Sequence, residues 1–487
     1  MVALRMLFRR QRAPAPGAAK ASAQEALARG QYDVAFAVLE SAVRRGGGGN
    51  RAEQGQTWLQ LAAVYALYGD EGLENGQPAL RSAVTADPKL AAHPLYRALF
   101  WEFSAYRGAP LADVKRGLRE VPEHAVEGAP ESFDAVAAYH AAAALFAVDA
   151  AKSARRRLRA VPEDGLPAYL EWRRWSLLGQ CCETLGEWEE AAEAFAMAVA
   201  QAPEPERDAE RLSLAGAQVE LFRTEQALEQ LACVDADRLP PPERAVHRYL
   251  QGRAHLDLDN PNLAIECLRE AAMLDDSTAE ASYSVAFATA QALAAAGRTE
   301  EAVDAYHQAL AVVPAEHRAY TQHEAAYALI ECDRLSEAEA LLSEVITDPS
   351  YTQRGDALSD LADVRLRRGE LDSAHALAEE ALELGATAPA CITLGSVAFE
   401  YYRLEEAASW YEQALSASQT GDPFWVAAQQ MLADVYAQMG DEYAARVLLH
   451  AKAALEHTEA GSEWYLPLRQ YLDEAKGRLG GFERVLN

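Results

Sequence analysis

The sequence has no long apolar run. Nowhere in its 487 residues does it approach the ~18 consecutive apolar residues that a membrane span requires. Val, Ile and Thr are sparse while Ala is abundant, a composition that favours helices over strands. The chain is also longer than the roughly 250–300 residues at which one compact core stops growing. We therefore expect a helical protein that is divided into domains or built as an elongated array of repeats.

Catalytic motifs are missing as well. The sequence contains no HExxH, no GxSxG, no GxxxxGK[ST] and no GxGxxG after a predicted strand. The 11 histidines are dispersed, and no cysteine or carboxylate pattern completes a metal site around His247 and His255. Carboxylate pairs such as Glu189 and Glu190 recur at the start of predicted helices, where the helix dipole favours them. The sequence therefore predicts no enzyme, no cofactor and no metal site.

Cysteine is scarce and scattered. The six cysteines include no CxxC pair, a spacing that suits neither a zinc site nor a disulfide framework. Most fall inside helical apolar patterns, where a free thiol acts as a small hydrophobe. We expect a reducing, cytoplasmic location.

Positive charge is in short supply. Lys and Arg number 45 against 74 Asp and Glu, which gives a net charge of −29. A surface this acidic repels phosphate backbones, so we expect no nucleic-acid partner. One nearly neutral stretch holds five cations, namely Lys152, Arg155, Arg156, Arg157 and Arg159. They lie either at the last turn of a helix, where its dipole favours cations, or in a docking patch for an acidic partner.

Residues 1–15 form a basic segment rich in Pro and Ala, which we expect to be a disordered tail. Its apolar residues are too interrupted by arginines to make a secretory signal core. The alternative is weak contact with an anionic membrane surface. The residues that would make this contact are Leu4, Met6, Leu7, Phe8 and the arginines Arg5, Arg9 and Arg10.

An internal repeat dominates the rest of the sequence. Its clearest copy spans residues 175–203, and its diagnostic residues are Trp175, Leu178, Gly179, Gly186, Ala191, Phe195, Ala198 and Pro203. The second half of this spacing returns at Gly297, Ala302, Tyr306, Ala309 and Pro314. Units start near residues 16, 55, 135, 172, 208, 245, 283, 319, 355, 388 and 426, mostly 36–38 residues apart. A period of this length indicates a stack of repeated helix pairs.

The pattern resembles the tetratricopeptide repeat family. Small residues such as Gly179 and Ala191 stand where the two helices of a pair come closest, and Gly186 provides the chain reversal. One helix pair cannot bury its apolar face alone, so the units must stack. The resemblance implies an all-α, tetratricopeptide-like α-solenoid, which is a right-handed superhelix of antiparallel helix pairs that binds other proteins.

We expect four segments along the chain. After the tail at residues 1–15, degenerate units occupy residues 16–130 and a regular array occupies residues 131–456. Residues 457–487 provide a capping helix and a C-terminal tail. This amphipathic helix has no partner helix, runs from about Ser462 to Leu479, and covers the apolar end of the array.

The resemblance also suggests where a partner would lie. In tetratricopeptide arrays the first helix of each pair lines the concave groove through its second, fifth, ninth and twelfth positions. Family members that grip acidic chaperone tails use Lys and Asn there, and this chain has neither. The central units instead offer Tyr249, Arg253, Phe287, Gln291, Tyr320, His323 and Tyr327. Aromatics among hydrogen-bonding groups are typical of interface anchors; the alternative is that some of these rings pack between helices.

The sequence thus predicts a protein–protein interaction scaffold, adaptor or assembly chaperone that holds a partner segment in the concave groove. Its partners would be proteins or peptide segments of unknown identity. One alternative is a regulatory receptor for a short peptide. The other is an envelope-associated assembly factor that docks through the basic N-terminus. A fold alone does not choose among these.

Replacing Ala191 by Arg should lower the free energy of unfolding by about 3 kcal/mol or more, because a long charged side chain cannot fit where two helices meet closely. Ala302→Arg should do the same in another repeat. Thermal unfolding followed by circular dichroism measures both. Unaltered stability in the two variants would contradict the repeat register.

Overall fold

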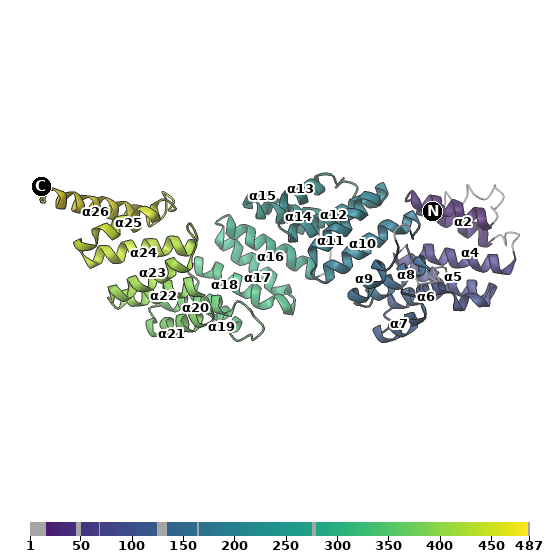
Figure 1. Cartoon of the computed structure of the whole chain (residues 1–487), viewed down its shortest axis with the longest axis horizontal. Coiled ribbons are helices and arrows are strands. Elements are labelled where there is room, and N and C mark those ends of the chain that lie inside the picture. The colour runs from purple at the N-terminus through teal and green to yellow at the C-terminus, as the bar shows by residue number, and fades with distance from the viewer. Residues whose placement is uncertain are drawn as a thin grey trace. The chain divides into compact units, whose positions relative to one another are not determined.

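The computed structural model describes residues 16–44, 50–67, 69–123, 134–162, 165–274 and 279–485, and every regular element in them is a helix. The predicted tail at residues 1–15 lies outside this described part. The helices divide into two compact units, Met1–Asn260 and Pro261–Asn487, which we describe one at a time (Figure 1). The prediction of an all-α helical repeat fold is confirmed.

Unit 1 consists of helix pairs and a few single turns. Neighbouring helices pack as the pairs α2/α3, α4/α5, α8/α9, α10/α11 and α12/α13, while α6 packs against α8. In chain order the elements are α2 Pro16–Ala28, α3 Tyr32–Arg44, α4 Arg51–Tyr65, α5 Gly69–Ala86, η2 Pro88–Ala92, α6 Pro94–Ala105, α7 Leu111–Gly117, η3 Leu118–Glu120, α8 Ala135–Phe146, α9 Ala151–Arg159, α10 Ala168–Thr184, α11 Trp188–Gln201, α12 Glu204–Glu220, α13 Thr224–Ala232 and α14 Pro241–Asp257.

Unit 2 is more regular. Its elements are α15 Pro261–Leu274, α16 Ala279–Ala295, α17 Thr299–Val312, η5 Ala315–His317, α18 Arg318–Glu331, α19 Leu335–Val345, α20 Arg354–Arg367, α21 Leu371–Glu383, α22 Thr387–Glu400, α23 Leu404–Ala417, α24 Pro423–Met439, η6 Asp441–Tyr443, α25 Ala444–Leu455 and α26 Tyr465–Val485. The pairs run from α16/α17 to α24/α25. The first helices α18, α20, α22 and α24 also touch one another in succession, so they form one layer.

The turn inside the pairs repeats one backbone conformation. A residue one to three positions after the end of the first helix has a positive φ in pair after pair, and it is the fifteenth residue of its predicted unit; Gly186, in the unit that starts near residue 172, has φ 71°. Glycine occupies this position at Gly30, Gly186, Gly297 and Gly369, and other residues do so at Asp149, Phe222, Asp259, Asp333 and Tyr402. Gly440 stands at the same place in its unit with a different conformation, φ 124° and ψ −178°. The amide after Gly186 bonds back to the Cys182 carbonyl at 2.9 Å, which closes the last turn of the helix. The predicted repeat register is therefore correct at these turns.

A ring fills the space beside a first-helix glycine in two distant repeats. A Cβ atom on Gly179 would lie 2.6 Å from the ring of Phe195, and one on Gly395 would lie 2.6 Å from the ring of Tyr411. Both rings are almost completely buried. The close approach predicted at Gly179 is confirmed, and its neighbour is the aromatic ring of the second helix.

The last helix, α26, packs against α25 and α24. Leu468 of α26 is fully buried and belongs to one apolar cluster with Ala433, Ala451 and Ala454. The helix begins at Tyr465, three residues after its predicted start. Its apolar side covers the pair α24/α25.

Replacing Tyr402 by Gly should raise the free energy of unfolding by about 1 kcal/mol, because the left-handed conformation costs an L side chain roughly 1–2 kcal/mol and costs glycine almost nothing. The side chain is 73% exposed, so little packing is lost. Chemical denaturation measures the change. Gly369→Ala, at the equivalent turn of the preceding pair, is the matched control and should destabilise. A less stable Tyr402→Gly variant would contradict this explanation.

Candidate functional site

The seven predicted groove residues fall in both units. Tyr249 and Arg253 lie on α14 of unit 1, and the other five lie on α16 and α18 of unit 2. The guanidinium of Arg253 donates to the Tyr249 hydroxyl at 3.1 Å and lies 3.5 Å from the Glu220 carboxylate of α12. Tyr249 is half-buried against the apolar cluster of α12 and α13. These two residues therefore link neighbouring helices.

Phe287 belongs to an aromatic cluster that joins three helices of unit 2. Its ring centroid lies 5.7 Å from those of Tyr283 and Tyr320 and 5.9 Å from that of Tyr306. The Tyr283 hydroxyl in turn hydrogen-bonds to Thr321 at 2.9 Å. For Phe287 these ring contacts favour the packing alternative. Gln291, one turn further along α16, is half-buried.

His323 connects α18 to α20. Its Nδ1 lies 2.7 Å from the Tyr351 hydroxyl and its Nε2 lies 3.0 Å from the Asp360 carboxylate. Its side chain is largely buried. Both ring nitrogens thus contact groups of the protein itself, so His323 links neighbouring repeats.

Two predicted residues are exposed. Tyr320 is 37% exposed and Tyr327 is 58% exposed, and they lie about two turns apart on α18. The hydroxyls of Tyr306 and Tyr320 hydrogen-bond to the Glu324 carboxylate, and burial raises the pKa of that carboxyl. Tyr320 is therefore held from two sides, by the ring of Phe287 and by Glu324.

Carboxylates surround Tyr327. Glu324, Glu331 and Asp360 are near enough to act on its hydroxyl electrostatically, together with Arg367. Burial is the main cause that raises the pKa of the neighbouring Asp363 carboxyl, and the charges of Asp360 and Glu331 also raise it. The ion pair with Arg367, at 2.8 Å, lowers this pKa. We call this surface the acidic–aromatic face; it consists of Tyr320, Glu324, Tyr327 and Glu331 of α18 and Asp360, Asp363 and Arg367 of α20.

The sequence prediction missed most charged members of this face. It followed the second, fifth, ninth and twelfth positions of each unit, and Glu324, Glu331 and Asp360 lie outside them. The signal was present nevertheless, because residues 320, 324, 327 and 331 are spaced four, three and four apart and so form one stripe of a helix.

In unit 1 the first helices surround a small cavity. It measures about 270 Å³ and is lined from α2, α3, α4, α6, α8 and α10, with Leu27, Leu59 and Tyr169 among the contacts. Helix α2 touches α10, and Arg173 of α10 donates to the Tyr32 hydroxyl at 3.0 Å. Residues 137–145 of α8 are buried without interruption. The first helices of unit 1 thus pack against one another around a cavity that both polar and apolar side chains line.

Buried ionisable groups accompany this packing. Glu102 of α6 and His140 of α8 lie 2.7 Å apart and are almost completely buried. Glu210 of α12 is also buried; burial raises the pKa of its carboxyl to about 7, while a hydrogen bond from Ser176 and the charge of Arg173 oppose the shift. Its Oε2 atom has no hydrogen-bond partner among the described residues.

The basic stretch on α9 is paired within unit 1. Arg157 is buried, and its guanidinium donates to the carbonyls of Leu118 at 3.1 Å and Val121 at 3.2 Å. The other arginines have carboxylate partners: Arg155 has Glu187, Arg156 has Glu123 at 2.9 Å, and Arg159 has Glu190. Within the described part of the chain, Lys152 alone among the five cations forms no ion pair. Four of the five charges thus already hold neighbouring segments together, which favours a structural role for these arginines.

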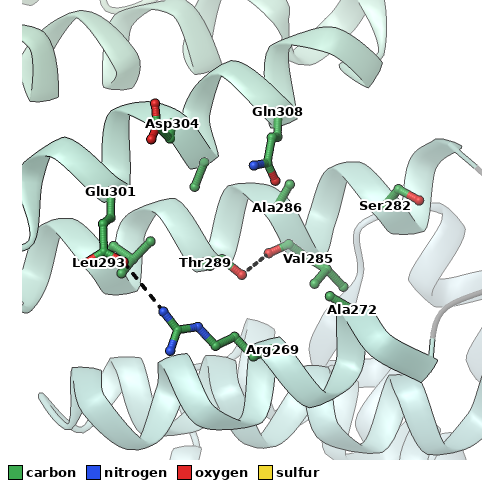
Figure 2. A pocket seen from close by; sticks show the side chains of 11 residues that line it. Arg269, Ala272, Ser282, Val285, Ala286, Thr289, Leu293, Glu301, Asp304 and Gln308 are labelled. Carbon is green, nitrogen blue, oxygen red and sulfur yellow. Dashed lines mark hydrogen bonds and ion pairs between the residues drawn. The ribbon is translucent and has the colours of Figure 1, made fainter.

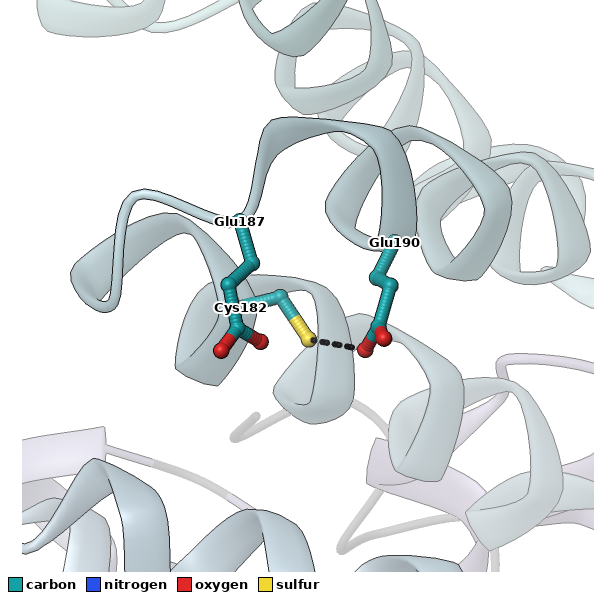
Figure 3. Close-up of side chains that lie close together, drawn as sticks. All are labelled: Cys182, Glu187 and Glu190. Carbon is teal, nitrogen blue, oxygen red and sulfur yellow. Dashed lines mark hydrogen bonds between the residues drawn. The ribbon is translucent and has the colours of Figure 1, made fainter.

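Cys182, Glu187 and Glu190 come close together between α10 and α11 (Figure 3). The Cys182 thiol lies 3.7 Å from the Glu190 carboxylate. Burial, followed by the charge of Glu190, raises the pKa of this thiol. Both carboxylates are also ion-paired with arginines of α9. A protonated thiol beside paired carboxylates does not suit a metal ion, so we assign this cluster to helix packing.

A shallow hollow lies on α16 between α15 and α17 (Figure 2). It measures about 430 Å³. Its charged groups largely neutralise each other, since Arg269 lies 3.7 Å from Glu301 and Glu301 also accepts from Arg298 at 2.7 Å. We assign no ligand to this hollow.

Stacked antiparallel helix pairs with a left-handed turn define the class of helical hairpin repeat proteins. Two family models described as tetratricopeptide repeat match the chain, at residues 249–317 and at residues 175–209. The chain therefore contains tetratricopeptide repeats in these two stretches. In its described residues no helix is both long enough and apolar enough to cross a membrane.

Comparison with solved structures gives distant similarities. The APC/C hetero-tetramer Cut9-Hcn1 is 14% identical, with 97% of this chain and 98% of that chain covered and a TM-score of 0.45. PilF of Pseudomonas aeruginosa is 19% identical, with 47% and 98% covered and a TM-score of 0.36. A tetratricopeptide repeat protein from Parabacteroides merdae is 15% identical, with 53% and 98% covered and a TM-score of 0.39. At TM-scores this low the similarities say nothing of partners. No curated protein sequence matches the chain.

The stability of unit 1 should fall as the pH rises through about 7. The pKa of Glu210 is raised on folding, so the protonated form is favoured in the folded state and the stability it provides is lost as the carboxyl ionises. Between pH 5.5 and pH 8, the free energy of unfolding of Glu210→Gln should fall by about 1–3 kcal/mol less than that of the parent chain. Denaturant unfolding at both pH values measures it, with Glu229→Gln on α13 as the matched control. An equal pH dependence in the parent chain and in Glu210→Gln would contradict this assignment.

Proposed function

We propose that this protein is an interaction scaffold or adaptor that holds a polypeptide segment on the acidic–aromatic face of unit 2. The observation that carries the proposal is the exposure of Tyr327 on a first helix, where Glu324, Glu331 and Asp360 act on its hydroxyl electrostatically together with Arg367. The tetratricopeptide matches support the class of function, because stacked helix pairs in this family present surfaces to other proteins.

The chemistry of the face suits a polypeptide ligand. A tyrosine offers a large apolar ring and a polar hydroxyl, and it has few rotatable bonds to immobilise. Tyr320 is already fixed by Phe287 and Glu324 before any partner arrives. Binding to a pre-organised ring loses less conformational entropy than binding to a mobile one.

A reducing compartment such as the cytoplasm fits the cysteines. All six are free thiols, and Cys181, Cys182 and Cys391 are buried in helices. Burial raises the pKa of Cys181 to about 12, which keeps its thiol protonated and unreactive. We include this location in the proposal.

The double change Tyr320→Ala and Tyr327→Ala should weaken capture of the cellular partner by about 10-fold or more. The melting temperature should fall only modestly, because Tyr327 is 58% exposed and Tyr320, which is 37% exposed, loses only its contacts with Phe287 and Glu324. Affinity purification with quantitative mass spectrometry measures capture.

By contrast, Phe287→Ala should lower the free energy of unfolding by about 2–4 kcal/mol, because its ring packs among three others.

Tyr402→Gly serves as the matched control for the capture experiment. It removes another exposed tyrosine of unit 2, which lies at the turn between α22 and α23 and outside the acidic–aromatic face. This variant should retain the partner. Full retention by the Tyr320/Tyr327 variant as well would overturn the proposed site.

A further inference from the structure

We propose that the segment bound by the acidic–aromatic face is cationic: a stretch of a partner protein in which arginines stand at short intervals. This inference rests on the proposed function and adds the chemical class of the ligand. It follows from the charges of the face, from the environment of Tyr327 and from the row of first helices beside it.

Negative charge dominates the face. Glu324, Glu331, Asp360 and Asp363 contribute four carboxylates, and Arg367 contributes one guanidinium. That guanidinium is already used, because it pairs with Asp363 at 2.8 Å and donates to the Ile330 carbonyl at 3.3 Å. His323 is engaged at both ring nitrogens. An incoming cation therefore meets carboxylates whose charge the protein itself balances only in part.

Burial makes these carboxylates receptive to a cation. Glu324 and Asp363 are both half-buried, and desolvation is the main cause that raises the pKa of each. A carboxylate that has lost part of its hydration, and that has other carboxylates nearby, is stabilised strongly by a positive group placed against it. A neutral or acidic segment would lose hydration at the same place without this gain.

Tyr327 favours arginine in particular. A guanidinium can stack on a tyrosine ring and donate to a neighbouring carboxylate at the same time, whereas an ammonium is a compact and strongly hydrated point charge. The ring of Tyr327 is 58% exposed, and Glu331 and Asp360 are near enough to act on its hydroxyl electrostatically. Ring and carboxylates together thus form a place for one arginine side chain.

Further carboxylates follow on the next first helices of unit 2. Glu400 of α22 and Asp434 of α24 lie near enough to the Tyr411 hydroxyl to act on it, and Asp434 also accepts a hydrogen bond from Tyr471 of α26 at 2.8 Å. Since packed helices lie roughly 8–10 Å apart, the row from α18 to α24 spans roughly 24–30 Å, which is the reach of about 7–9 extended residues. The net charge of −29 would in addition speed the encounter with a cationic segment.

The test is a fluorescence-anisotropy titration of the full chain with a labelled nonapeptide in which arginine alternates with alanine. A nonapeptide with glutamine in place of arginine is the control ligand, and a lysine version is the third. We expect the arginine peptide to bind about 10-fold or more tightly than the glutamine peptide, with lysine between them. Its affinity should fall when salt is raised from about 50 to about 300 mM.

Two double variants test whether the arginine peptide binds on the acidic–aromatic face. The double change Glu331→Gln and Asp360→Asn should weaken the arginine peptide by about 10-fold, since it removes two charges beside Tyr327. The control is Glu405→Gln with Glu406→Gln at the start of α23, which removes the same charge from an exposed site on a second helix. Equal losses in the two variants would mean that net charge alone attracts the peptide, and they would overturn the inference.

The chain itself contains a competing cationic segment in residues 1–15, with Arg5, Arg9, Arg10 and Arg12. The titration is therefore repeated on a chain that lacks these residues. Unchanged affinity supports a separate protein as the source of the ligand. Tighter binding after the deletion would overturn that assignment, because the chain's own segment would then be the occupant.

Failure of this inference can be told apart from failure of the proposed function. If the arginine and glutamine peptides bind equally but the Tyr320/Tyr327 variant still loses its cellular partner, the ligand is not cationic and the scaffold function stands. If that variant keeps its partner as well, the face is not a binding site and both proposals fall.

Discussion

A pair of antiparallel helices has more apolar surface than the pair alone can bury, and the organisation of this chain follows from that constraint. Within a pair, a glycine of the first helix admits a ring of the second, as Gly179 admits Phe195 and Gly395 admits Tyr411. Between pairs, each first helix must find another helix to cover its remaining apolar side. Stability is thus shared among neighbours, and the side of a first helix that no neighbour covers is the part left for function.

The two units meet this constraint differently. In unit 1 the first helices pack around a small cavity, and α8 is buried over residues 137–145. The polar groups inside it are few and specific, such as the Glu102–His140 pair. In unit 2 the first helices form a layer in which α18 keeps Tyr320 and Tyr327 at the surface. The same repeat therefore buries its first helices against one another in one unit and leaves an exposed face in the other.

The sequence was sufficient for the repeat because the constraints on it are local. Chain reversal requires a left-handed residue at a fixed place, and close packing requires a small one, so Gly186 and Gly179 are informative without any knowledge of neighbours. The candidate site depended on contacts between repeats. Phe287 and Tyr327 both occupy predicted groove positions of their repeats. Only the structure shows that Tyr306 and Tyr320 cover the ring of Phe287, whereas the ring of Tyr327 is exposed. The arginines of α9 looked like a patch because their carboxylate partners lie about thirty residues away along the chain.

The left-handed turn has a consequence for how the protein can change. Its geometry is the same whether the residue is Gly369, Asp333 or Tyr402, and the side chain points outward: Phe222 is 80% exposed and Tyr402 is 73% exposed. These hairpins therefore each offer one projecting site, where a residue other than glycine costs roughly 1–2 kcal/mol but leaves the turn in place. Successive repeats set such sites at regular intervals along one edge of each unit. Mutation can decorate that edge, or a chemist can label it, while the helix pairs beneath stay as they are.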